Sequence, residues 1–304
     1  MLKTIVAGVD GREGGRDALA LAGRLALLAG GELVAVRALP FDAYAGRGGG
    51  PQHSALADAE AQRQVEHDLA EAGLTARTRL IVDTSPARAL HRMAEALDAD
   101  VIVVGSTRHG AVGGVFAGDD AAATLHASSC AVAVAPRGLA DEEWAPVNRI
   151  GVGLDASAEA HQALALAVAL ATDCGASLVV RTVVPAPIAD ADVTAYDADW
   201  LERSKEAARQ QLDGALADVT VEVSGQVAVG TPVDELVELS RTVDLLVVGS
   251  RAWGPVRRTL MGSTAAKLMR KAHCPVLVLP RGAATGGPGE TDPAGARSEA
   301  STAA

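Results

Sequence analysis

The segment Val101-Ile-Val-Val-Gly-Ser106 recurs 144 residues later as Leu245-Leu-Val-Val-Gly-Ser250, and this repeat decides how the chain is organised. Two further pairs of segments show nearly the same offset: Ile5-Val-Ala-Gly-Val-Asp10 with Ile150-Gly-Val-Gly-Leu-Asp155, and 131–138 with 275–282. A constant offset over separated segments indicates an internal duplication. Solenoid repeats have periods of about 20 to 50 residues, so each longer copy is predicted to be a whole domain.

Segments typical of strands and of helices alternate within each copy, as expected for a parallel sheet covered by helices. In the second copy the pattern predicts strands over 147–154, 177–184, 219–227, 245–249 and 276–279, and helices over 158–172, 199–216, 232–240 and 262–271. The wholly apolar run at 245–248 predicts a central strand, and the alternating run at 219–223 predicts an edge strand. Hydroxyl-proline pairs at Ser85-Pro86 and Thr231-Pro232 predict helix starts. We therefore expect an α/β protein with two tandem Rossmann-like domains, each a five-stranded parallel sheet with helices on both faces.

The length of 304 residues is sufficient for two domains. We place them at 1–138 and 147–281, with a polar hinge between them that contains Asp141-Glu-Glu-Trp144. Residues 282–304 are rich in Ala, Gly, Pro, Ser and Thr, and we expect this tail to be disordered because it lacks apolar material to offset its ordering entropy.

The composition argues against several classes of function. A formal net charge of −11 and an aromatic content of 2% do not suit a nucleic-acid-binding surface. The three cysteines have no paired spacing, and the histidines have no metal-ligand spacing, so no metal site is predicted. No apolar run approaches the roughly 18 residues that a membrane span requires. We expect a cytoplasmic protein without membrane contact.

Two features of each copy are expected at the carboxyl ends of the strands, where open α/β sheets bind ligands. Asp10 and Asp155 close the first strands, where each could bind a ligand or cap the next helix. The loop that starts at Gly249 ends where a new helix begins, and free backbone amides at such a place attract anions. The hydroxyl groups of Ser263 and Thr264 add donors there.

These residues resemble the universal stress protein family, whose ATP-binding members carry Gly-x2-Gly-x9-Gly-(Ser/Thr) in this loop. The resemblance runs through both copies and includes the aspartate of the first strand and the closing Cys274-Pro-Val-Leu-Val278. It implies a five-stranded parallel sheet and association through the last strand. In one subgroup it also implies an adenine nucleotide, ATP or a relative of it, that is held without rapid turnover.

Carried over by position, the resemblance implies a nucleotide site in the second domain. Its residues would be Asp155 and Val183 beside adenine and ribose, and Gly249, Arg251, Gly262, Ser263 and Thr264 at the phosphates. Ala252 stands where the motif has its second glycine. If that position needs a positive φ, alanine costs roughly 1–2 kcal/mol, which weakens binding without abolishing it.

The first copy departs further from the motif. Asp10, Gly105 and Gly118 match it, but Arg108 replaces the second glycine and Asp119 replaces the phosphate-binding hydroxyl. A carboxylate about 5 Å from a phosphate charge costs on the order of 3 kcal/mol at an effective dielectric of ~20, or roughly a hundredfold in affinity. We therefore expect the second domain to hold most of the nucleotide.

The sequence thus predicts a stress-response protein that holds ATP as a regulatory ligand. Whether magnesium accompanies the ATP stays open. An interaction protein that binds no nucleotide is the main alternative, and a slow ATPase is a further one. A Walker A motif is absent and no set of catalytic residues is recognised, so whether the protein is an enzyme also stays open.

The last strands of the two copies, 131–135 and 276–279, are strongly apolar. An uncovered apolar edge strand invites aggregation, and a second copy in the same chain supplies a partner at high effective concentration. We expect these strands to pair within one chain, and a further homo-oligomer is left open.

Overall fold

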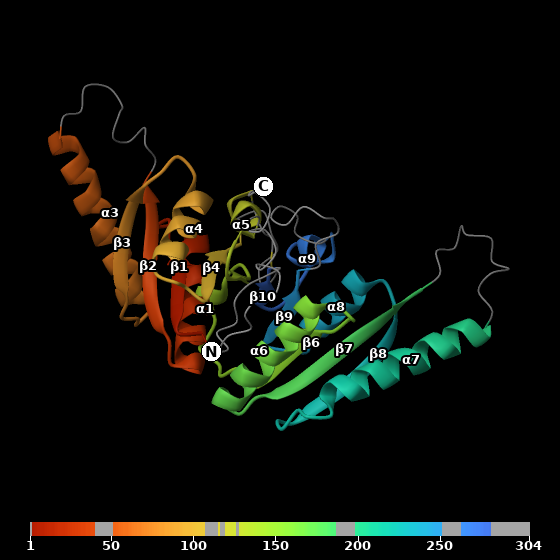
Figure 1. Cartoon of the computed structure of the whole chain (residues 1–304). Coiled ribbons are helices and arrows are strands. Elements are labelled where there is room, and N and C mark those ends of the chain that lie inside the picture. Colours follow the sequence, from red (N-terminus) through yellow and green to blue (C-terminus); the bar gives the residue numbers. More distant parts are fainter. Residues whose placement is uncertain are drawn as a thin grey trace, which may run out of the picture.

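A single ten-stranded sheet runs through the whole molecule in the computed structural model (Figure 1). The structure describes residues 2–39, 51–106, 115, 119–125, 128–186, 198–250 and 263–280. The strand order is β3-β2-β1-β4-β5-β10-β9-β6-β7-β8. The two sequence copies therefore form the two halves of one sheet, lying side by side.

Each half is a five-stranded parallel sheet, as predicted. The first contains β1 (Thr4–Gly8), β2 (Glu32–Leu39), β3 (Arg77–Val82), β4 (Val101–Gly105) and β5 (Ala131–Ala135), all in parallel pairs. The second contains β6 (Arg149–Gly153), β7 (Ser177–Pro185), β8 (Val223–Gly230), β9 (Leu245–Gly249) and β10 (Val276–Leu279), again in parallel pairs. The central position of β9 agrees with its wholly apolar pattern, and β8 lies at the edge of the sheet.

The halves meet through β5 and β10, which pair antiparallel, and this confirms the predicted pairing. Leu277 lies opposite Ala133 at the centre of the pairing, and every residue of both strands is buried. Each strand therefore covers the apolar edge of the other.

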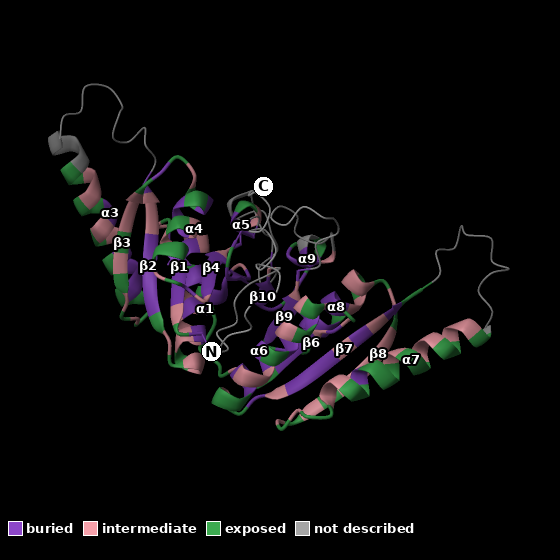
Figure 2. Cartoon of the chain, viewed as in Figure 1, coloured by how far each residue is buried: buried purple, intermediate pink, exposed green. Residues whose placement is uncertain are grey.

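Helices cover both faces of the sheet (Figure 2). One face carries α1 (Glu13–Ala29), α3 (Pro51–Glu71), α6 (Ala158–Cys174) and α7 (Ala198–Leu216). The other carries α4 (Pro86–Ala96), α5 (Asp119–Leu125), α8 (Pro232–Ser240) and α9 (Ser263–Leu268). Successive strand residues point to opposite faces, so Ile5 joins the core under the first set while Val6 joins the other. No helix in these described ranges has the length and apolar character to cross a membrane.

Both predicted hydroxyl caps are present. Ser85 Oγ accepts a hydrogen bond from the Arg88 amide at 3.4 Å, and Thr231 Oγ1 accepts one from the Asp234 amide at 3.4 Å. In each case proline occupies the first turn of the helix that follows. The prolines therefore have the structural role that the sequence indicates.

The linker begins with a short 3-10 helix, η1 (Leu139–Asp141), that is tied to the first half by a buried carboxylate. Asp17 on α1 is 1% exposed and accepts hydrogen bonds from the amides of Gly138 and Ala140 at 3.0 and 2.9 Å. Burial raises the pKa of Asp17, while these two hydrogen bonds favour its charged form. The start of the linker is therefore fixed on α1.

Two predicted elements of the second half differ from the observed ones by three residues or more. The third strand was expected over 219–227, whereas β8 runs from Val223 to Gly230 and pairs with β7 along that length. Val219 and Val221 pack against the core but do not pair with β7. Alternation of apolar and polar residues does not distinguish a paired strand from a segment that only packs on the core. The helix expected over 262–271 is α9, which ends at Leu268. The tail 282–304 lies outside the described residues.

Candidate functional site

A pocket of about 300 Å³ opens where β6, β7 and β9 end, on the face covered by α8 and α9. The connection from β6 runs through α6 on one face, and the connection from β9 runs through α9 on the other. Divergence of neighbouring connections is the feature that places ligands in open α/β sheets. The volume is at the lower end of the roughly 300–1,000 Å³ of small-molecule pockets.

Four residues predicted for the site line this pocket: Asp155, Val183, Gly249 and Thr264. They come from four separate elements or their ends, across 110 residues of sequence, and the sheet topology brings them together. Ser263 begins α9 next to Thr264. Three other predicted residues, Arg251, Ala252 and Gly262, lie outside the described residues.

Asp155 shapes the turn that leads from β6 into α6. Its Oδ1 accepts a hydrogen bond from the Ser157 amide at 2.8 Å, and Ser157 Oγ in turn accepts one from the Ala160 amide at 3.2 Å. Ser157, rather than Asp155, is therefore the N-cap of α6. The capping alternative is wrong for Asp155, which stands two residues before the cap and lines the pocket.

Gly249 is required by packing as well as by its place in the pocket. A Cβ atom on this residue would lie 2.5 Å from the Glu159 carbonyl carbon and 2.7 Å from the Ala160 amide nitrogen. Real Cβ atoms essentially never approach backbone so closely. The glycine lets the end of β9 touch the start of α6, a steric role that the sequence pattern did not reveal.

Arg181 on β7 is a pocket residue that the sequence analysis missed. Its Nε and Nη2 donate to Gln226 Oε1 at 3.2 and 2.7 Å, and its Nη1 donates to the Glu235 carbonyl oxygen at 2.7 Å. The side chain is only 17% exposed. The one available signal was a single charged residue in the segment 178–184, which otherwise holds aliphatic residues and Thr182.

Ser157, Pro185, Pro232 and Leu236 also line the pocket and were not predicted. Pro232 and Leu236 belong to α8, which forms one wall. Asp155 and Arg181 give the lining one carboxylate and one guanidinium beside apolar side chains. Such a mixture suits a ligand with a flat apolar part and several hydrogen-bonding groups.

The first half repeats part of this arrangement. Asp10 Oδ1 accepts a hydrogen bond from the Arg12 amide at 3.0 Å, as Asp155 does from Ser157, and Arg12 provides no side-chain cap to α1. A Cβ atom on Gly105 would collide with the backbone of Gly14 on α1. Asp119 begins α5, and Gly118 lies outside the described residues.

Cys130 and Cys274 do not add nucleophilic chemistry. Burial raises the pKa of Cys130 to about 11 and also raises the pKa of Cys274 well above its ordinary value. Both thiols are therefore protonated near neutral pH, and both pack in the core under α4, α5, α8 and α9. Among the side chains that the structure describes, no group of three or more forms a metal-binding cluster.

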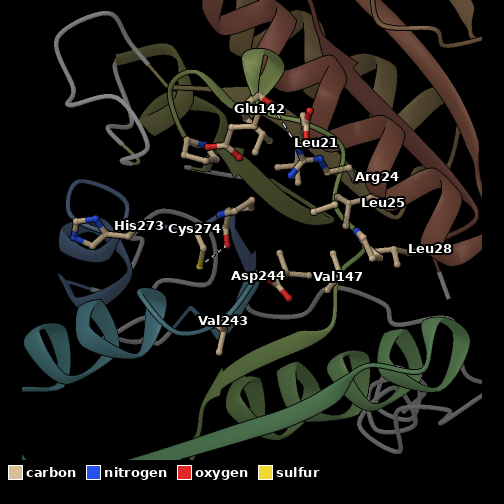
Figure 3. A pocket seen from close by; sticks show the side chains of 17 residues that line it. Leu21, Arg24, Leu25, Leu28, Glu142, Val147, Val243, Asp244, His273 and Cys274 are labelled. Atoms are coloured by element: carbon tan, nitrogen blue, oxygen red, sulfur yellow. Dashed lines mark hydrogen bonds between the residues drawn. The ribbon is translucent and has the colours of Figure 1, made fainter.

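A second cavity, of about 190 Å³, lies under the linker between the two halves (Figure 3). Its walls are largely aliphatic and include Leu25, Leu28 and Val147. Asp244, also in its lining, is engaged by the amides of Asn148 and Arg149 at 2.8 and 2.9 Å. None of the predicted site residues lines this cavity.

Comparison with known proteins places the fold in context. A model of the universal stress protein family matches the chain twice, over residues 1–136 and 146–280. Curated universal stress proteins of Mycobacterium bovis and Mycobacterium tuberculosis are each 31% identical over 136 residues, which is 42% of this chain and 46% of theirs. The match therefore spans about half the length of these curated relatives.

Two solved structures resemble the whole tandem. A universal stress protein from Archaeoglobus fulgidus has a TM-score of 0.62 at 20% identity, covering 92% of this chain and 98% of that chain. A putative universal stress protein from Pseudomonas aeruginosa has a TM-score of 0.62 at 16% identity, covering 92% of this chain and 93% of that chain. These likenesses show the shared fold.

Proposed function

The chain belongs to the universal stress protein family, and on that premise we propose that its second half binds an adenine nucleotide, ATP foremost, as a regulatory ligand in the cytoplasm. The observation that carries this proposal is the gathering of Asp155, Val183, Gly249 and Thr264 around one pocket. These are residues that the resemblance to the family implies for a nucleotide site.

In this proposal the base and ribose occupy the part of the pocket between Asp155 and Val183. The carboxylate accepts hydrogen bonds from ribose or base, and the aliphatic side chain packs on the ring. Thr264 and Ser263, at the start of α9, serve the phosphates together with Gly249. Arg181 lies in the wall, where Glu235 Oε2, 3.6 Å from its Nη1, already balances its positive charge.

Calorimetry of the full chain with ATP tests the proposal. We expect binding with a Kd below about 1 mM, and we expect Asp155→Asn to weaken it at least about tenfold, because a carboxylate hydrogen bond to the ligand is lost. Asp10→Asn is the matched control, since it makes the same change in the first half. Absence of binding, or a loss confined to Asp10→Asn, would contradict the assignment to the second half.

An interaction protein without nucleotide is the second candidate, and Ala252 in place of the motif's glycine favours it. Protein purified under native conditions and then denatured would release no adenine nucleotide in that case. Recovery of stoichiometric ATP or ADP from the denatured protein would exclude this candidate. A slow ATPase would in addition release phosphate faster than a buffer control with the protein saturated.

A further inference from the structure

A groove with a volume of about 780 Å³ lies on the first half, away from the nucleotide pocket, and we call it the linker groove. Three segments line it: one face of α1, the C-terminal end of α3 with residues 72–74, and the linker from Leu139 to Trp144. Its volume falls within the roughly 300–1,000 Å³ of small-molecule sites. Nothing in the proposed nucleotide function uses it.

The three segments give the groove an apolar floor between two acidic walls. On α1, Ala20, Gly23 and Leu27 line the groove at spacings of three and four residues, which places them on one helix face. On the sheet, α3 packs over β2 and β3, whereas α1 packs over β1, β4 and η1, so α1 lies between α3 and the linker.

Each wall carries two carboxylates. Asp68 and Glu71 come from α3, and Asp141 and Glu142 come from the linker on the other side of α1. Arg16 and Arg24 also line the groove, and Arg24 Nη2 donates to the Leu139 carbonyl oxygen at 3.5 Å (Figure 3). Four carboxylates against two guanidinium groups leave the lining with an excess of negative charge.

Asp68 is the residue that points to a ligand. It is only 3% exposed, and its Oδ1 accepts a hydrogen bond from Gln64 Nε2 at 2.9 Å. Its Oδ2 is buried and has no hydrogen-bond partner among the described residues. A buried carboxylate oxygen without a donor is costly, and a positively charged donor entering the groove would relieve that cost.

Two exposed apolar side chains lie in the same groove. Leu27 is 68% exposed and Trp144 is 60% exposed, so both present apolar surface at the groove. The face of an indole ring attracts organic cations, and an exposed leucine offers contact for a hydrocarbon chain. Apolar contact and negative charge therefore occur together along the groove.

We propose that the linker groove binds a linear aliphatic polyamine, with one ammonium group at Asp68 and Glu71 and another at the linker carboxylates. The hydrocarbon between the two charges crosses the small side chains of α1, and Trp144 contacts an ammonium group through its ring. Alkyl ammonium groups have pKa values near that of lysine, about 10.4, so the ligand carries these charges at neutral pH. Because Asp68 Oδ2 is buried, side chains beside it have to shift to admit the ammonium group.

Titration with spermidine and spermine in about 150 mM salt tests this, since salt screens non-specific attraction to the acidic chain. Calorimetry gives the affinity of every variant and checks that there is one site. Trp144 fluorescence in a chain carrying Trp200→Phe and Trp253→Phe is a second readout for the variants that keep Trp144. We expect Asp68→Asn to weaken binding at least about tenfold and Trp144→Leu to weaken it about threefold or more. Glu60→Gln, an exposed residue of α3 outside the groove, is the matched control and should change nothing.

Equal binding by wild type, Asp68→Asn and Trp144→Leu would overturn the proposal, and so would equal weakening by Glu60→Gln. No binding up to about 1 mM polyamine would also overturn it, and would leave the groove to a basic segment of another protein. If Asp68→Asn fails to fold, as judged by circular dichroism, the exposed variants Glu71→Gln and Trp144→Leu carry the test. ATP binding by the second half is measured in parallel, so failure of one proposal is distinguished from failure of the other.

Discussion

At the scale of single residues, charged hydrogen bonds and close backbone contacts limit which substitutions the fold accepts. Asp83, after β3, accepts hydrogen bonds from Arg88 Nη2 at 2.6 Å, from Arg88 Nε at 2.9 Å and from the Ser85 amide at 3.0 Å. The Arg88 hydrogen bonds hold the pKa of Asp83 well below its ordinary value, with the Ser85 amide adding to the effect. The ionised form of this carboxyl is therefore the one that the fold favours.

The sign of the pH dependence follows from that shift. Because the pKa of Asp83 is lower in the folded than in the unfolded chain, its contribution to stability is present above the unfolded value of about 3.9 and is lost as the pH falls below it. We expect Asp83→Asn to lower the Tm at pH 7 and to flatten the dependence of Tm on pH between about 2 and 4. Thermal unfolding followed from pH 2 to pH 7 measures both effects; parallel curves for the two proteins would contradict the expectation.

A second residue-scale prediction concerns Gly249. Alanine there would place its Cβ against the backbone of α6, so we expect Gly249→Ala to lower the free energy of unfolding by roughly 1–3 kcal/mol. Gly214 on α7 is the control, because its Cβ would meet nothing within 4 Å. Gly214→Ala should instead stabilise by up to about 1 kcal/mol through helix propensity. Urea denaturation of the two variants shows whether their effects have opposite signs.

At the scale of elements, one device recurs in both copies. Asp100, just before β4, accepts hydrogen bonds from the amides of Lys3 and Thr4 at 2.7 and 2.8 Å. Asp244, just before β9, does the same for Asn148 and Arg149 at the start of β6. These carboxylates attach the first strand of each half to its central neighbour.

We expect Asp244→Ala to lower the free energy of unfolding by about 1–2 kcal/mol, because two backbone amides lose a charged acceptor but partly regain water. Asp218→Ala, an exposed position after α7, should change stability by less than about 0.5 kcal/mol. Equilibrium denaturation compares them. Equal stability of the two variants would show that the hydrogen bonds from Asn148 and Arg149 to Asp244 do not stabilise the fold.

At the scale of the whole molecule, the duplicated halves form one sheet rather than two linked bodies. The β5–β10 pairing buries both last strands, and α1 contacts α6 across the junction. Each hydrophobic core cluster includes residues of both halves. The linker is therefore not what holds the halves together.

Cleavage of the linker tests this directly. A protease site inserted between Glu142 and Glu143 lies at exposed residues, and after cutting we expect the two fragments to co-elute in size-exclusion chromatography. The physical reason is that separation would expose two apolar edge strands to water. Elution of two half-size fragments would show that the pairing is too weak to persist without the covalent connection.

Much of the fold was predictable because its signals are local. The apolar runs at β4 and β9, the capping pairs before α4 and α8, and the repeat of whole segments all depend on neighbours along the chain. The same local signals misplaced β8, since alternation at 219–223 fits packing against a core as well as it fits a ladder. Edge strands are weakly specified by pattern because only one neighbour restrains them.

Some residues of the candidate site were predictable from the sequence and others were not. Asp155, Val183, Gly249 and Thr264 were selected from motif positions that the parallel topology carries to one end of the sheet. Arg181 was missed because its partners, Gln226 and Glu235, lie on β8 and α8, more than 40 residues away in sequence. Sequence spacing carries no information about which distant side chain will complete a buried hydrogen-bond network.

By itself the sequence determined the duplication, the α/β class and the strand ends at which a ligand would bind, because periodicity and repetition are properties of the chain alone. Only the tertiary structure decided that the last strands pair antiparallel, that Ser157 rather than Asp155 caps α6, and that Asp68, Leu27 and Trp144 line one groove. Those outcomes depend on packing between segments far apart in sequence. Burial of apolar surface drives that packing. The packing brings together residues that no pattern along the chain identifies as neighbours.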